Sequence, residues 1–396
     1  MKIVAILESS VTSGGGFNQS LNAILQMQRL VADNFQFSVI TSVKENIEYL
    51  QNFSIKSQHV KVGFFNDIFS LISASLLGSQ IIAKLGLTSR LEKKLIKEGC
   101  DLVYFVKPSI HAIALQKINY IITVWDLCHR DDLEFPEVHF NGVFRAREWL
   151  YRNILPSAFV VLVDSEILAK KMVARYGIDR SRVLPMPFAP SPFIENVSQK
   201  NRDNVLTIYE LERGYFFYPA QFWPHKNHIR VLQALTILND QGIKCKVVFV
   251  GGDQGNLNYI EAKIKEYNLE KQVRLLGFIP AEHIKPLYES CQAVVMPTYF
   301  GPTNLPPLEA WSLGKPLIYS DHLKAQAGNA AIMINPDSAE ELADAMKKIF
   351  DDSILKKYIA RGYGRLKEID NERKLCEDRL VLMLESFGKR RECWVN

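Results

Sequence analysis

The chain of 396 residues has six cysteines but no C-x-x-C pair, so its sequence indicates neither a zinc site nor a disulfide framework. It has no D-x-D triplet, and a divalent cation held by carboxylates against a diphosphate is therefore not expected. The N-terminal residues MKIVAILESS lack the basic head and long apolar core of a signal peptide. These absences predict a protein of the reducing cytoplasm that uses no metal and no other cofactor.

Signatures of nucleic-acid binding are also missing. The net charge of +5 is spread along the chain, and neither an RRM strand pair nor a zinc finger is present. With 47% hydrophobic and 23% charged residues, the composition is that of an ordinary globular protein, long enough for two domains. We therefore expect a two-domain protein that does not bind nucleic acid.

One uncharged run, at the start of Ile68–Lys97, is sixteen residues long and too short to span a bilayer. A basic stretch follows it. Two interpretations remain open: a surface that touches an anionic membrane, or a buried helix followed by a solvated amphipathic helix. The basic residues are Lys84, Arg90, Lys93, Lys94 and Lys97.

Two halves of the chain repeat one pattern, in which short apolar strands alternate with helical segments. The first half has KIVAIL, FSVIT, LVYFV, YIITVW and FVVLV, and the second has YFFYPA, KVVFVG, VRLLG, AVVMP, LIYS and AIMIN. Such strands predict parallel sheets covered on both faces. We therefore predict an α/β fold of two Rossmann-like, doubly wound domains that face a central cleft. The expected divisions are a first domain over 1–190, a linker over 191–210, a second domain over 211–370, and a C-terminal helix over 371–396 that can pack back on the first domain.

Glycines follow the first predicted strand, where Gly14, Gly15 and Gly16 precede a helix. Glycine lets the backbone approach a ligand closely, and a helix N-terminus supplies N–H groups nearby. The spacing is not that of the G-x-G-x-x-G fingerprint, which argues against a nicotinamide site. The segment is either a ligand-binding loop or a flexible turn.

A carboxylate and an imidazole, Asp126 and His129, directly follow the strand YIITVW. Groups placed just past a parallel strand suit acceptor positioning or proton transfer. The alternative is that Asp126 caps a turn and His129 lies in a surface loop.

Strand ends in the second half carry candidate donor-binding residues. Lys226 follows YFFYPA beside a helix start at Asn227, where it can meet a phosphate, although a solvated lysine is the simpler alternative. Gly251 ends the next strand and either lines a nucleotide pocket or forms a tight turn. Gly277 and Phe278 end the strand after it, where a base could rest against the backbone.

The segment YFGPTNLPPLEAWSLGKPLIYSD, from Tyr299 to Asp321, predicts a loop and then a short helix. Pro306 and Pro307 suit the first turn of this helix. A loop and a helix start that direct N–H groups to one place form an anion site. Glu309 either contacts a ligand there or only complements the helix dipole.

Three segments, PAQFWPHKNH, VRLLGFIP and NLPPLEAWSLGKPLIYSD, together resemble the family 4 glycosyltransferases, and the resemblance covers nearly the whole chain. It implies the GT-B fold. It also implies transfer of a sugar from a UDP- or GDP-sugar, with retention of configuration and without a metal, to an acceptor held mainly by the first domain. Similar members of that family often build bacterial surface polysaccharides such as O-antigen or capsule.

By position, the resemblance assigns Glu309 to the nucleotide ribose and Lys226 to the donor diphosphate. Two residues depart from the family pattern. Gly301 replaces the first glutamate of a pair, and Gln221 replaces an arginine five residues before the lysine. We expect these changes to reflect a different sugar preference.

A further departure lies in the first half, where Trp125 replaces the histidine of the family's His-Asp pair, although Asp126 is retained and His129 is close by. The catalytic candidates are thus Asp126, His129 and Lys226. The donor-binding candidates are Gly14, Gly15, Gly16, Gln221, Lys226, Gly251, Gly277, Phe278, Thr303, Asn304, Leu305 and Glu309. Of these, Thr303, Asn304 and the backbone of Leu305 are expected to replace the lost sugar contacts.

The function implied by the resemblance is transfer of a hexose or deoxyhexose to a glycan or a polyprenyl-linked acceptor. The expected location is the cytoplasm, with contact at the inner face of the cytoplasmic membrane left open. Two alternatives also remain open: a GT-B sugar-nucleotide 2-epimerase, and a non-catalytic subunit that binds a sugar nucleotide.

Overall fold

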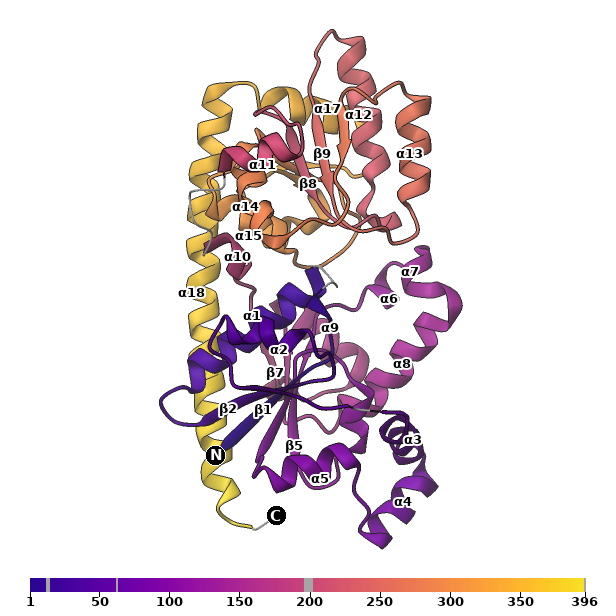
Figure 1. Cartoon of the computed structure of the whole chain (residues 1–396), viewed down its shortest axis with the longest axis vertical. Coiled ribbons are helices and arrows are strands. Elements are labelled where there is room, and N and C mark those ends of the chain that lie inside the picture. Colours follow the sequence, from indigo (N-terminus) through magenta and orange to yellow (C-terminus); the bar gives the residue numbers. More distant parts are fainter. Residues whose placement is uncertain (12–14, 62, 196–201, 395–396) are drawn as a thin grey trace. The chain divides into compact units, whose positions relative to one another are not determined.

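The computed structural model describes residues 1–11, 15–61, 63–195 and 202–394 (Figure 1). The chain divides into two compact units. The first contains Met1–Leu127, Gly142–Phe188 and Glu372–Asn396, and the second contains Cys128–Asn141 and Ala189–Asn371.

The first unit has a seven-stranded parallel sheet in the order β3-β2-β1-β4-β5-β6-β7. Strands β4 and β6 are buried along their whole length, as expected for a parallel sheet covered on both faces. The strands are β1 (Lys2–Leu7), β2 (Gln36–Thr41), β3 (Ser57–His59), β4 (Leu102–Phe105), β5 (Asn119–Val124), β6 (Val160–Val163) and β7 (Val183–Pro185). The helices are α1 (Gly15–Val31), α2 (Asn46–Gln51), α3 (Phe64–Ser73), α4 (Leu76–Leu85), α5 (Arg90–Lys97), α8 (Val143–Ile154) and α9 (Glu166–Tyr176), with 3-10 turns at η2 (Ile110–Ala114) and η4 (Arg180–Arg182).

The second unit has a six-stranded parallel sheet in the order β10-β9-β8-β11-β12-β13. The strands are β8 (Phe216–Pro219), β9 (Val247–Val250), β10 (Val273–Leu275), β11 (Ala293–Met296), β12 (Leu317–Ser320) and β13 (Ile332–Ile334). The helices are α6 (Cys128–Asp131), α7 (Pro136–His139), α10 (Pro192–Glu195), α11 (Arg202–Ile208), α12 (His228–Asp240), α13 (Leu257–Glu266), α14 (Ala281–Ser290), α15 (Leu305–Ser312), α16 (Lys324–Ala327) and α17 (Ala339–Lys348), with 3-10 turns at η6 (Pro224–Lys226) and η7 (Asp321–Leu323).

The predicted α/β class is confirmed, and each strand predicted from the apolar pattern is present. Two strands at the edge of the first sheet, β3 and β7, were not predicted. Each has only three residues, and β3 reads SQH, so neither carries an apolar period long enough to recognise.

The observed units differ from the predicted divisions in two places. Residues 128–141 group with the second unit, although the sequence places them inside the first domain. The expected linker over 191–210 contains α10 and α11, which both pack on α14. The last helix, α18 (Asp352–Arg391, yellow in Figure 1), begins earlier than predicted, but the two units divide within it between Asn371 and Glu372, next to the predicted boundary.

The C-terminal part of α18 belongs to the first unit. Phe387 packs on Phe159 with ring centroids 4.9 Å apart, and Glu377 accepts a 2.6 Å hydrogen bond from Arg29. Contacts of this kind depend on residues far apart in the chain.

Helices α3 and α4 form a sharply bent pair with an exposed apolar surface. Ser75 caps α4 by accepting a hydrogen bond from the N–H of Gly78, and a Cβ at Gly78 would lie 2.1 Å from the carbonyl oxygen of Ile72. The bend therefore requires glycine at this position. Exposed side chains include Leu76 (75%) and Leu77 (73%), so the interpretation of this segment as a buried helix is wrong.

Among the described residues, no single helix combines the length and hydropathy needed to cross a bilayer. Residues Phe65–Ser73 and Leu76–Leu85 meet both criteria only as a pair, and the pair is bent by 109°.

Candidate active site

The loop after β8 places Lys226 at the carboxyl end of the second sheet. Asn227, which has a left-handed φ of 55°, fixes the end of this loop. Its side-chain amide donates hydrogen bonds to the carbonyl oxygens of Pro297 (3.1 Å) and Pro336 (2.9 Å). Asparagine tolerates this conformation better than most residues. The short turn before α12 is therefore favoured by the residue itself and is held in place by its two hydrogen bonds to distant carbonyl oxygens.

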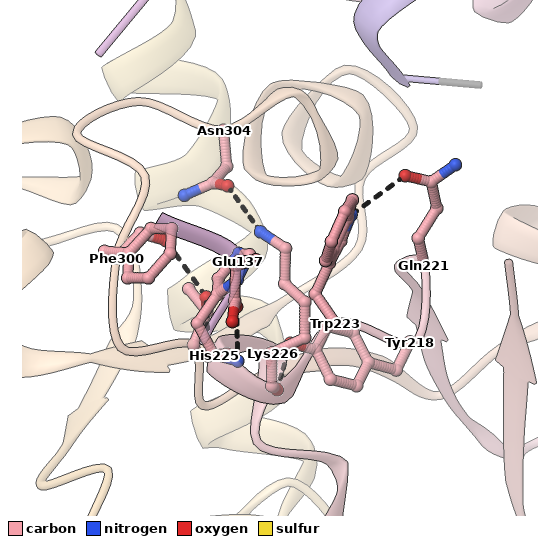
Figure 2. Close-up of polar contacts among 9 residues, drawn as sticks. Glu137, Tyr218, Gln221, Trp223, His225, Lys226, Phe300 and Asn304 are labelled. Atoms are coloured by element: carbon pink, nitrogen blue, oxygen red, sulfur yellow. Dashed lines mark hydrogen bonds and ion pairs between the residues drawn. The ribbon is translucent and has the colours of Figure 1, made fainter. Parts of the chain in front are cut away.

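Lys226 is held at both its backbone and its side chain (Figure 2). Its carbonyl oxygen accepts a 2.6 Å hydrogen bond from the hydroxyl of Tyr218 in β8. Its Nζ donates a 3.2 Å hydrogen bond to Oδ1 of Asn304, the residue directly before α15. The lysine and the loop before α15, which the sequence proposed separately as donor-binding elements, thus lie together.

Asn304 is itself fixed by buried polar groups. Gln326 of α16 accepts from the Asn304 N–H (3.0 Å) and donates to the Asn304 carbonyl oxygen (2.7 Å). The Asn304 side chain donates to the hydroxyl of Tyr319 (2.7 Å), which in turn donates to Gln326 (2.9 Å). This network directs Oδ1 of Asn304 towards the ammonium of Lys226.

The start of α15 offers fewer N–H donors than the sequence suggests. A helix N-terminus normally has four backbone N–H groups without a partner inside the helix. Here two of the four positions are Pro306 and Pro307, which have no N–H. The Asn304 N–H is used by Gln326, which leaves the N–H of Leu305. An anion here would meet mainly the Leu305 N–H, the helix dipole and Lys226.

Glu309 lies in α15 with its side chain buried. Burial raises the pKa of its carboxyl to about 7, and a 2.6 Å hydrogen bond from the hydroxyl of Tyr288 opposes that rise. The carboxyl is thus largely protonated below neutral pH and is already engaged by a residue of α14. Its predicted contact with a ribose stays a prediction.

Gly301, where the resemblance expects a glutamate, has a left-handed φ of +107°. A Cβ at this position would lie 2.8 Å from Oδ1 of Asn304, and the Gly301 carbonyl oxygen accepts from the Asn304 amide (2.9 Å). Both the backbone conformation and the neighbouring asparagine therefore oppose a glutamate here.

The other candidates of the second unit lie at the ends of β8, β9 and β10 or before α15. Gln221 accepts a 3.1 Å hydrogen bond from the indole of Trp223. A Cβ on Gly251 would lie 2.4 Å from the carbonyl oxygen of Ala220, so this glycine is needed for close packing of two loops. Gly277 accepts from the Gly251 N–H (2.9 Å), Phe278 is exposed, and Thr303 is partly exposed.

The candidates of the first half lie in different settings. Gly15 and Gly16 begin α1 and are exposed, whereas Gly14 lies outside the described residues. Asp126, after β5, forms a 2.7 Å ion pair with Arg147 of α8. His129 lies in α6 with its side chain fully buried, which excludes the alternative that it is a surface-loop residue.

Sequence reasoning missed Glu137, which lies in α7 and contacts His225 next to Lys226 (Figure 2). The two residues are 88 positions apart, and no spacing in the sequence connects them. The constrained run Trp223-Pro224-His225 is the single local sign that this loop needs support.

Residues 202–364 match the family model described as glycosyl transferases group 1. Through these residues the chain is similar to the group 1 glycosyl transferases. The matched range contains the loop of Lys226 and all of α15.

Two curated proteins that are similar to this chain are named as O-antigen chain mannosyltransferases. The chain is 26% identical over 242 residues to O-antigen chain mannosyltransferase B of Escherichia coli, covering 60% of this chain and 64% of the relative. It is 24% identical over 245 residues to O-antigen chain mannosyltransferase RfbU of Salmonella typhimurium, covering 60% and 63%. The match spans less than two thirds of the length of each relative.

The fold of the chain is GT-B. A crystal structure of Anabaena HepE in complex with UDP and glucose superposes with a TM-score of 0.71 at 16% identity, covering 98% of this chain and 100% of that chain. At this identity the likeness establishes the fold and not the substrate.

Proposed function

We propose that the protein is a retaining glycosyltransferase of family 4 that moves a hexose or deoxyhexose from a UDP- or GDP-sugar to a glycan or lipid-linked saccharide. The observation that carries the proposal is the ammonium of Lys226, held 3.2 Å from Asn304 at the start of α15. A lysine beside a helix N-terminus suits a diphosphate. The names of the mannosyltransferase relatives and the UDP in HepE agree with this chemistry, and the O-antigen names favour surface polysaccharide synthesis.

The proposed reaction takes place on one face of the donor sugar. The bond from C1 to the diphosphate oxygen breaks, and the acceptor oxygen forms the new bond to C1 on the same side. The proton of the acceptor hydroxyl passes to the departing phosphate oxygen. Lys226 and the dipole of α15 stabilise the charge that develops on the phosphate, so we propose that no metal takes part. Asp126 and His129 are kept as candidates for contacts with the sugar or the acceptor, and Glu309 as the candidate for the ribose.

Thermal-shift measurements with UDP, GDP, dTDP and CMP test the donor class. A nucleotide that binds only the folded protein raises its melting temperature. At a hundredfold excess of nucleotide over Kd, the free energy of unfolding increases by roughly 3 kcal/mol. We expect UDP or GDP to produce the shift, with and without EDTA. No shift with any of the four would contradict the proposal.

Product analysis separates the three candidate activities. Transfer to an added acceptor with retained configuration at C1 supports the transferase. Formation of the 2-epimer of the donor without an acceptor assigns an epimerase. Nucleotide binding without either reaction, across a donor panel, assigns a non-catalytic subunit.

We also propose that the protein works at the inner face of the cytoplasmic membrane, which it contacts through α3 and α4. The exposed apolar residues of this pair are Phe65, Ile68, Leu71, Ile72, Leu76, Leu77, Ile81 and Leu85. Arg90, at the start of α5, lies over the ring of Phe65 at 4.7 Å, and further lysines follow it in α5. An apolar surface bordered by basic residues suits the boundary between acyl chains and anionic headgroups.

Replacing Leu76 and Leu77 together with glutamate should strongly weaken this contact. Two leucines that enter the acyl region contribute about 1.5 to 3 kcal/mol each, so vesicle binding should weaken by at least about a hundredfold. The measurement is co-sedimentation with vesicles of phosphatidylcholine and phosphatidylglycerol. The control replaces Leu375 and Leu382, which are exposed on α18, in the same way. Absence of binding by the unmodified protein, or equal loss in both double variants, would refute the contact.

A further inference from the structure

Residues 128–141 leave the first unit after Leu127, pack within the second unit, and return to the first unit at Gly142. Their apolar anchor is Phe135, whose ring lies 5.3 Å from that of Tyr299 and 5.4 Å from that of Phe300. Tyr299 and Phe300 lie in the loop that leads from β11 to Asn304 and α15. Residues 128–141, which we call the excursion, thus pack on one of the two loops that form the candidate donor site.

Glu137, in α7, connects the same excursion to the other loop (Figure 2). Its Oε1 accepts a 3.1 Å hydrogen bond from the backbone N–H of His225 and lies 2.5 Å from Nδ1 of the His225 ring. Both side chains are more than nine-tenths buried, at 6% and 9% exposure. Burial raises the pKa of Glu137, but hydrogen bonds from His225 outweigh it and leave the pKa below its ordinary value. The carboxylate is therefore ionised at neutral pH and directed at His225.

His225 links Glu137 to Lys226, which follows it directly in the sequence. The His225 ring stacks on Phe300 with centroids 3.7 Å apart and planes 15° apart. Its carbonyl oxygen accepts from the N–H of Tyr299 at 2.9 Å. Ring, N–H and carbonyl are all engaged, so the peptide that leads into Lys226 has one orientation, with Nζ directed at Asn304.

We propose that Glu137 is a positioning residue for the donor diphosphate, acting through His225 on Lys226. This inference rests on the proposed function and adds a residue that it does not include. The contact between Glu137 and His225 comes from an unusual segment, because both ends of the excursion continue into the first unit. The phosphate-binding lysine is thus ordered by a segment whose two ends both lead into the other unit, the one proposed to hold the acceptor.

The test is titration of UDP and GDP into the full-length protein and into Glu137→Gln, with uridine and guanosine as ligands that lack phosphate. Glutamine keeps an acceptor for the His225 N–H but removes the charge. We expect about tenfold weaker binding of the diphosphate, as for loss of one charge-assisted contact, and unchanged binding of the nucleoside. The matched control is Glu134→Gln, an exposed glutamate of the same excursion, which should bind as the unmodified protein does.

A double-mutant cycle separates positioning from general weakening of the fold. In the Lys226→Ala background, Glu137→Gln should cause no further loss of diphosphate affinity, because the group that it positions is gone. His225→Gln, which removes the ring from the other side of the contact, should behave as Glu137→Gln does. Equal losses in both backgrounds, equal losses for nucleoside and diphosphate, or unchanged UDP and GDP affinity in Glu137→Gln would overturn the inference while leaving the proposed function intact. Failure of the unmodified protein to bind either diphosphate would overturn both.

Discussion

Lys226→Ala is expected to lower kcat/KM for the nucleotide sugar by about 100- to 1,000-fold, the range found when one group that stabilises transition-state charge is removed. In the proposed reaction the negative charge on the departing diphosphate is largest in the transition state. With Pro306 and Pro307 at the start of α15 and the Asn304 N–H bonded to Gln326, few backbone donors are available to take over from the ammonium. The loss should therefore appear in kcat as well as in KM.

The measurement is steady-state transfer with the donor identified by the nucleotide panel. The matched control is Lys246→Ala, because this lysine is exposed, pairs with Glu212 at 2.7 Å, and lies in the same unit. Lys226→Arg keeps the charge but changes the geometry, and partial activity is expected. Full activity of Lys226→Ala, with an unchanged melting temperature, would remove Lys226 from the site.

Glu309→Gln is expected to remove the pH dependence that this one carboxyl gives to stability. The folded protein holds the Glu309 proton up to a pH of about 7, whereas the ordinary value is 4.5. Between these pH values the folded state binds more protons than the unfolded state, so the free energy of unfolding falls as the pH rises. Above pH 7 the buried carboxylate lowers stability by on the order of 3 kcal/mol, and glutamine avoids this penalty.

Urea unfolding at pH 5 and pH 8 provides the measurement for Glu309. At pH 5 the variant and the unmodified protein should be similar, and at pH 8 the variant should be the more stable of the two. Tyr288→Phe is the companion variant. It removes the 2.6 Å hydrogen bond that lowers the pKa of Glu309, so its stability should fall further as the pH rises. A stability difference between Glu309→Gln and the unmodified protein that does not change with pH would contradict the raised pKa.

The predictions that succeeded from sequence rest on short-range patterns. Apolar strands of four to six residues, separated by helices, predicted both parallel sheets correctly, and loops at strand ends located Lys226 and Asn304. A strand such as β4 is recognisable because burial on both faces demands an unbroken apolar run. A three-residue edge strand such as β3 makes no such demand and was missed.

The predictions that failed concern burial and partners, which local patterns do not encode. Residues 68–83 lack charge and suggested a buried helix, yet the bend at Ser75 leaves Leu76 and Leu77 exposed. A surface loop was the alternative to a site role for His129, and its side chain is fully buried. An apolar side chain favours burial and a polar side chain favours exposure, but the neighbours that surround it in the folded chain decide which of the two occurs.

The sequence is enough to predict the two α/β halves, the lysine at the end of β8 and the helix that follows Asn304, because each depends on residues within a few positions of one another. How these parts work together depends on contacts between distant segments. Gln326 occupies the Asn304 N–H, the left-handed φ of Gly301 leaves no place for a glutamate, and Glu137 reaches His225 from 88 residues away. Such contacts form only when packing brings distant segments together, and that packing is what directs Lys226 at the site proposed for the donor phosphates.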